Sequence, residues 1–146
     1  MKTIEISINK SAVIKAVSLN SNYLDAAKDD NANRISTLEY DDNILSGFWT
    51  DCCGEVCEKL KEFIAGSQIS SSEFYLKLEL SGAFDDNLAP SVETDIQDAL
   101  TAGITSRWLG LRASEMADDW MNKASALLKR ALSKLCHRKR PVRKGV

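Results

Sequence analysis

The chain has 146 residues, of which 44% are hydrophobic and 27% are charged, and its net charge at neutral pH is −2. This composition is that of an ordinary globular protein able to bury one core, and it excludes collagen-like, low-complexity and wholly disordered classes. No apolar run reaches the roughly 18–20 residues that a membrane-spanning helix needs, and residues 1–10 lack the apolar segment of a signal peptide. A single histidine, His137, excludes most histidine-based catalysis and metal sites.

The charge is unevenly distributed along the chain. Residues 129–146 carry eight basic and no acidic side chains, whereas the rest of the chain carries 11 basic and 21 acidic ones. A basic end of this kind either seeks phosphates or an acidic partner, or is simply solvated and complements the dipole of the helix before it. We expect residues 1–136 to form one helical domain and residues 137–146 to form a basic, flexible C-terminal tail.

The N-terminal third is predicted to contain a strand and then helix. Residues 2–8 place isoleucine at every second position, which indicates a half-buried strand. From Asn9 the apolar spacing becomes helical, and we expect one or two short helices that break near residues 20–22. Residues 28–33 are polar and predict a loop.

The middle of the chain is predicted to contain a long helix and a second strand. Ser36 and Glu39 have the spacing of a capping box, so a helix should follow. Its apolar stripe runs from Ile44 to Ile64, and Gly66 with Ser67 should end it. Residues 73–80 alternate again, and we expect this strand to pair antiparallel with the first.

Two further helices are predicted in the C-terminal half. Pro90 suits a first helical turn, and the apolar face that follows comprises Val92, Ile96, Leu100, Ile104, Trp108 and Leu111. Gly103 lies on or beside that face and indicates close approach of another helix. The last helix has its apolar face between Met116 and Leu135. The expected fold is therefore mainly α, a bundle of about four helices with a small two-stranded antiparallel β element.

The four cysteines are predicted to be reduced, and the three in residues 52–57 are predicted to serve packing. Cys52, Cys53 and Cys57 lie in one amphipathic stretch, which favours a cytosolic host over a secreted disulfide framework. Cys53 and Cys57 together with Cys136 and His137 have the ligand types for zinc, but they form no CxxC knuckle and free cysteine is commonly buried. We expect no metal and no cofactor.

No catalytic constellation is evident. The carboxylate pairs at residues 85–86 and 118–119 read as solvated surface, and the chain has no glycine-rich phosphate loop, nucleophile elbow or HExxH motif. A cysteine nucleophile would need His137, whose cationic neighbours disfavour an imidazolium. We predict that the protein is not an enzyme and has no catalytic residue.

Two features are candidates for an interface. Each of the three tryptophans lies on an apolar stripe, where core packing is the default, and Trp108 is our candidate for an interface anchor. The candidate basic residues are Arg138, Lys139, Arg140, Arg143 and Lys144. No aromatic side chain is interleaved with them to stack on bases, so only non-specific contact with DNA phosphates stays open.

The segment Leu88–Trp108 (LAPSVETDIQDALTAGITSRW) opens with proline, repeats apolar residues and closes on tryptophan. It resembles the central helix of phage head–tail connector proteins, and residues 42–64 resemble the long first helix of that family. This resemblance covers about residues 38–111; the N-terminal strand, the early helix and the long final helix depart from the connector pattern. The order of elements, the segment 34–37 and the basic, proline-broken end are also similar to uncharacterised Bacteroidetes prophage proteins.

The resemblance implies a non-enzymatic structural protein of the virion, a head–tail connector or adaptor. Such a protein would self-associate into a ring and dock to neighbouring virion rings, in the cytoplasm of a bacterial host and in the virion. It transfers no single functional residue, because that family acts through shape and oligomeric contact. The alternative is a small nucleic-acid-binding module that uses the basic C-terminal end. We expect no membrane partner and no small-molecule substrate.

Overall fold

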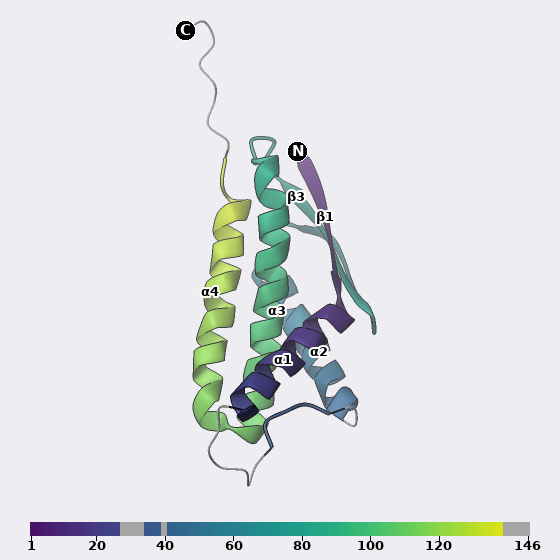
Figure 1. Cartoon of the computed structure of the whole chain (residues 1–146). Helices are drawn as coiled ribbons and strands as arrows, with labels where there is room; N and C mark the ends of the chain where they lie inside the picture. The colour runs from purple at the N-terminus through teal and green to yellow at the C-terminus, as the bar shows by residue number, and fades with distance from the viewer. Residues whose placement is uncertain (27–33, 39–40, 139–146) are drawn as a thin grey trace, which may run out of the picture.

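The computed structural model describes residues 1–26, 34–38 and 41–138 (Figure 1). The elements in chain order are β1 (Lys2–Asn9), α1 (Lys10–Ala26), α2 (Asp42–Lys59), β2 (Ile64–Ile69), β3 (Glu73–Leu80), α3 (Ala89–Arg112) and α4 (Ala117–Leu135). Short 3-10 turns at Asp86–Leu88 and Ser114–Met116 precede α3 and α4. The described part is mainly helical and has four α-helices, as predicted, but its sheet has three strands rather than two.

The sheet has the order β1-β3-β2 and is antiparallel throughout. β1 pairs with β3 as predicted, and this register sets Ile6 opposite Leu76 and Ile8 opposite Phe74. All four of these side chains are buried, whereas residues between them point to solvent, which is the alternation of a half-covered sheet.

The third strand, β2, occupies residues that were predicted to end a helix. α2 stops at Lys59, and the chain turns before it pairs with β3 from Ile64 onward. Gly66, expected as a helix terminator, instead lies at a β-bulge where the register shifts. The cause is strand pairing: residues 64–69 form backbone hydrogen bonds with β3 in a hairpin. These bonds outweigh the helical spacing that Ile64 shares with the apolar residues of α2.

α1 is one continuous helix and does not break near residues 20–22. Ser21 is buried there, its hydroxyl donates to the carbonyl of Ser18 and it accepts the backbone N–H of Thr37 at 3.2 Å. A polar residue in the segment where a break was predicted therefore forms hydrogen bonds within a continuous helix. Ser36 donates its hydroxyl to Asp25 at 2.6 Å, and α2 begins only at Asp42, so Ser36 is not the predicted cap. Glu39 lies outside the described residues.

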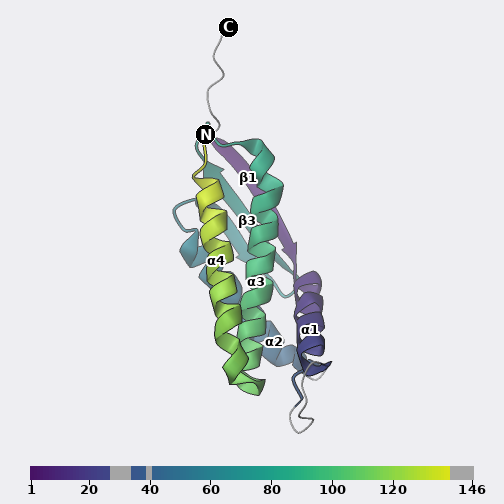
Figure 2. The ribbon, with the colours of Figure 1, turned by 60° about the vertical axis from the view of Figure 1, so that its left-hand side comes forward.

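α3 is the central element of the core. It packs against the other three helices and against β1, and Figure 2 shows it flanked by α4 and α1. The predicted apolar residues are fully or almost fully buried from Val92 to Trp108, but Leu111 is 61% exposed near the end of the helix. A Cβ at Gly103 would lie 3.3 Å from Cys52 Sγ, which accounts for the glycine by the close approach of α2.

α4 lies antiparallel beside α3 along the length of the molecule (Figures 1 and 2). Its buried side chains are Ala124, Leu127, Ala131 and Leu135, which belong to the predicted apolar face. The end of α4 and the start of β1 lie at the same end of the molecule, and the α3–α4 connection lies at the opposite end.

Candidate functional site

Trp108 is not available as an interface anchor. Its side chain is 0% exposed, and its indole N–H donates to the carbonyl of Ile35 at 2.5 Å. The guanidinium of Arg112 covers the ring, with its carbon 5.0 Å from the ring centroid. The correction follows from the segment 34–38, which closes over this end of α3 and leaves the indole no free face.

Two of the basic side chains of α4 form ion pairs with a buried carboxylate of α3. Asp95 of α3 is buried, and its carboxylate accepts from Arg130 at 2.9 Å and from Lys134 at 2.7 Å. Lys134 also donates to the hydroxyl of Ser91. Burial raises the pKa of Asp95, but the hydrogen bonds and charges of Arg130 and Lys134 outweigh burial, so this pKa lies below its ordinary value. This cluster joins α3 to α4.

Arg138 is the only one of the five candidate basic tail residues that lies in the described part of the chain. Its backbone forms an isolated antiparallel bridge with Phe84, in the connection between β3 and α3. The carbonyl of Phe84 also accepts from Lys2 at 2.8 Å, so the two ends of the described chain meet at this connection. Lys139, Arg140, Arg143 and Lys144 lie outside the described residues.

A groove of about 690 Å³ runs between α1 and α4 over the surface of α3. Its side chains are Ala16, Asn20, Gln97, Asp98, Thr101, Ala102, Trp120, Lys123, Ala126, Leu127 and Arg130. Trp120 is partly exposed, and the ammonium of Lys123 lies 5.0 Å from its ring centroid. Trp120, and not the predicted Trp108, is therefore the tryptophan that a partner can reach.

An apolar ridge borders this groove on α1. Leu19 and Tyr23, one turn apart, are 60% and 75% exposed. Helical spacing puts them close to the face that holds Ala16 and Asn20, which line the groove. The ridge and the groove together form one continuous surface, and part of that surface is apolar. Exposed apolar patches of this kind often mark interaction sites. The helical spacing of residues 16, 19, 20 and 23 is the feature of the sequence that indicates this surface.

Charge is separated along the last helical segment. Glu115, Asp118 and Asp119 lie at its start and are exposed, and no basic residue stands among them. The segment from Lys123 to Arg138 carries only basic charges. Acidic residues at the start and basic residues at the end also complement the dipole of α4. The two ends of this segment are at opposite ends of the molecule (Figure 1).

The cysteines of α2 are not activated thiols. Cys52 and Cys53 are buried, and burial raises the pKa of Cys52 to about 11 even though Arg107 opposes the shift. Burial likewise raises the pKa of Cys53 and that of Cys57. All three stay protonated near neutral pH, where a thiol is a poor nucleophile. Across residues 1–26, 34–38 and 41–138, no three His, Cys, Asp or Glu side chains are grouped to hold a metal ion.

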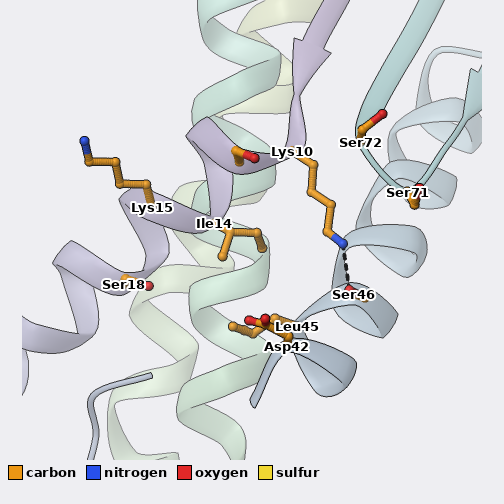
Figure 3. A pocket seen from close by; sticks show the side chains of 10 residues that line it. Lys10, Ile14, Lys15, Ser18, Asp42, Leu45, Ser46, Ser71 and Ser72 are labelled. Carbon is orange, nitrogen blue, oxygen red and sulfur yellow. Dashed lines mark hydrogen bonds between the residues drawn. The ribbon is translucent and has the colours of Figure 1, made fainter. Parts of the chain in front are cut away.

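A second hollow, of about 500 Å³, lies where the start of α1, the start of α2 and the β2–β3 turn meet (Figure 3). It is lined mostly by polar side chains, namely Lys10, Ser11, Lys15, Ser18, Asp42, Ser46, Ser71 and Ser72, with Ile14 and Leu45. Lys10 extends from α1 toward α2 and donates to the hydroxyl of Ser46 at 2.6 Å, whereas Lys15 points away from that pair (Figure 3).

In comparisons with protein-family models, curated proteins and solved structures, none matches the chain. None of the helices in the described part combines the length and apolar character required to cross a membrane.

Proposed function

We propose that the protein is a non-enzymatic assembly protein of a phage or prophage, a head–tail connector-like adaptor that acts by self-association and by docking to neighbouring virion rings. The observation that carries the proposal is the separation of charge between the two ends of the segment 115–138. A head-to-tail contact between copies brings unlike charges together, and such heterologous contacts generate rings when the rotation closes.

The surface between α1 and α4 supports the same proposal. Trp120 on one wall, with Leu19 and Tyr23 on the opposite rim, provides large side chains of the kind that dominate protein interfaces. Small side chains at Ala16, Ala102 and Ala126 leave room for a partner to approach. An adaptor that docks to a neighbour needs a surface of this kind.

The alternative is a small nucleic-acid-binding module that uses the basic end. Lys129 and Arg138 favour it, because no ion pair among the described residues includes either of them. Arg130 and Lys134 count against it, because the guanidinium of Arg130 and the ammonium of Lys134 both pair with Asp95 within the fold, and its negative charge offsets one of their two positive charges. The alternative therefore depends mainly on the basic residues beyond Arg138.

Sedimentation velocity tests self-association. We expect a concentration-dependent oligomer at 50 mM salt that weakens at 500 mM salt, because exposed charge pairs are screened. Asp118→Asn/Asp119→Asn removes two acidic charges from the start of α4 and should weaken the oligomer at low salt. Trp120→Ser should weaken it at both salt concentrations, because its contribution is mainly apolar.

The matched control is Glu62→Gln/Glu79→Gln, which removes the same charge from exposed positions elsewhere. It should leave the oligomer unchanged. A protein that stays monomeric at all concentrations and at both salt levels would contradict self-association. Salt-sensitive binding of duplex DNA by a monomer would replace the proposal with the nucleic-acid alternative.

A further inference from the structure

The polar hollow between α1, α2 and the β2–β3 turn has rigid walls. The backbone N–H of Lys10 donates to the carbonyl of Ser72 at 3.0 Å, which ties the turn to the start of α1. The indole N–H of Trp49 donates to the carbonyl of Ser70 at 3.0 Å, which ties the same turn to α2. Trp49 is itself fully buried and makes an edge-to-face contact with Phe74. The hollow is therefore preorganised by the core beneath it.

Lys10 is a half-buried cation without a carboxylate partner. None of the ion pairs formed by the described residues includes it, and its ammonium makes one hydrogen bond, to Ser46. An ammonium has three donors, so two remain. A partly desolvated charge is less favourable without a counter-ion, and an anion at this point would supply one.

Lys10, Ser46 and Ser71 lie between two adjoining hollows. They line the larger hollow and also a smaller one of about 280 Å³, whose other side chains are Trp49, Thr50, Ile69 and Ser70. The hydroxyl of Ser46 accepts from Lys10 and keeps its own hydrogen to donate. The hydroxyl of Ser71 has no hydrogen-bond partner among the described residues. One polar side chain from each of α1, α2 and the β2–β3 turn therefore borders both hollows.

The carboxylate of Asp42 limits where an anion can bind in this region. Its carboxylate lines the larger hollow one turn before Ser46 on α2, and it repels an anion placed near it. The smaller hollow has no acidic side chain. An anion is therefore favoured away from Asp42, on the side of the smaller hollow that Lys10, Ser46 and Ser71 border.

We propose that Lys10, Ser46 and Ser71 form a binding site for a phosphate-class oxyanion. A lysine ammonium supplies the charge, and two hydroxyls donate to other oxygens of the same tetrahedral group. The phosphate comes either from a free phosphate or phosphomonoester, or from the backbone of a nucleic acid. This site is separate from the groove that carries Trp120 and goes beyond the proposed assembly function.

Amide NMR titration with inorganic phosphate, against chloride at equal ionic strength, tests the site. We expect saturable shifts at the backbone amides of Ser46 and Ser71 with phosphate and none with chloride. Lys10→Met should weaken phosphate binding by about tenfold or more, because a charge-assisted hydrogen bond is lost. Lys15→Met is the matched control, since Lys15 lines the same hollow but points away, and it should change the affinity less than about threefold.

Two further variants separate binding from folding. Ser71→Ala removes one donor without touching the bond between Lys10 and Ser46, and it should weaken phosphate binding several-fold. Asp42→Asn removes the repelling charge and should tighten binding, an effect that a purely structural role would not produce. A short single-stranded oligonucleotide, titrated in parallel, identifies the source: stronger saturation by it, lost in Lys10→Met, assigns the phosphate to nucleic acid. Equal responses to phosphate and chloride, or no effect of Lys10→Met and Ser71→Ala, would overturn the proposal.

Discussion

Leu100 and Leu111 are the same residue type on one helix but in opposite environments, so they form a matched test of the core. Leu100 is 1% exposed and Leu111 is 61% exposed. Leu100→Ala should lower the free energy of unfolding by about 2–5 kcal/mol, because it removes buried methyl groups and leaves a cavity. Leu111→Ala should change it by less than about 0.5 kcal/mol. Urea denaturation measures both, and similar effects from the two variants would contradict the assignment of the buried face.

The tryptophans show what residue-level prediction could and could not do. Each lies on an apolar stripe, and the stripes are confirmed because Trp49 and Trp108 are fully buried. Which tryptophan reaches the surface depends on what covers it. Trp108 is covered by a loop from a distant part of the sequence, and no local pattern contains that information. The burial of Cys52 and Cys53 was predicted, because it depends only on their place in the stripe of α2.

At the scale of elements, the cluster around Asp95 joins α3 to α4. Asp95→Asn keeps the shape of the side chain but removes the charge that binds Arg130 and Lys134. We expect a loss of about 1–3 kcal/mol at pH 7, at the lower end of charged-group effects because Arg130 is 58% exposed and can turn to solvent. Urea denaturation measures this loss, and Glu79→Gln, an exposed change on β3 outside this cluster, is the control.

The effect of Asp95 should depend on pH in a defined direction. Its pKa in the folded protein is lowered, and an unfolded aspartate titrates at about 3.9. Its contribution is therefore fully present above about pH 5 and is lost as the pH falls through the folded-state pKa. The stabilities of the wild type and of Asp95→Asn should converge on acidification. A gap that stays constant down to pH 3 would show that Asp95 acts through shape rather than charge.

The helices and strands with a long hydrophobic periodicity were predicted correctly. The predictions failed where tertiary contacts determine the secondary structure. β1, β3 and α3 carry strong periodicity, and all three occur near their predicted places. β2 was missed because residues 64–69 are short and include Gly66, and only pairing with β3 makes them a strand. α1 was predicted to break at polar residues, but Ser21 bonds to Thr37 of the segment 34–38. Neither partner can be identified from local spacing.

At the scale of the whole molecule, the basic end separates the two functional hypotheses. Deleting residues 139–146 leaves Arg138 in place on Phe84, so the free energy of unfolding should change by less than about 0.5 kcal/mol. We expect weaker self-association in sedimentation velocity, because the deletion removes four of the basic charges that would attract the acidic start of α4 in another copy.

Duplex DNA binding, followed at several salt concentrations, gives the contrasting outcome. Neutralising phosphates with four side chains would give a slope of log affinity against log salt of about −3 to −4. Measurable binding near 0.15 M salt that disappears in the deletion variant would favour the nucleic-acid module. An intact oligomer in the deletion variant would show that the tail takes no part in contacts between copies.

The bulge in β2 has a consequence for the exposed edge of the sheet. β2 is an outer strand of the sheet, and its residues, Ile64–Ile69, carry no charge and no proline. A flat strand of this composition would invite edge-to-edge pairing between molecules and uncontrolled aggregation. The register shift at Gly66 twists the strand and interrupts its row of backbone donors and acceptors. The β2 edge of the sheet is thereby a poor template for amyloid-like stacking.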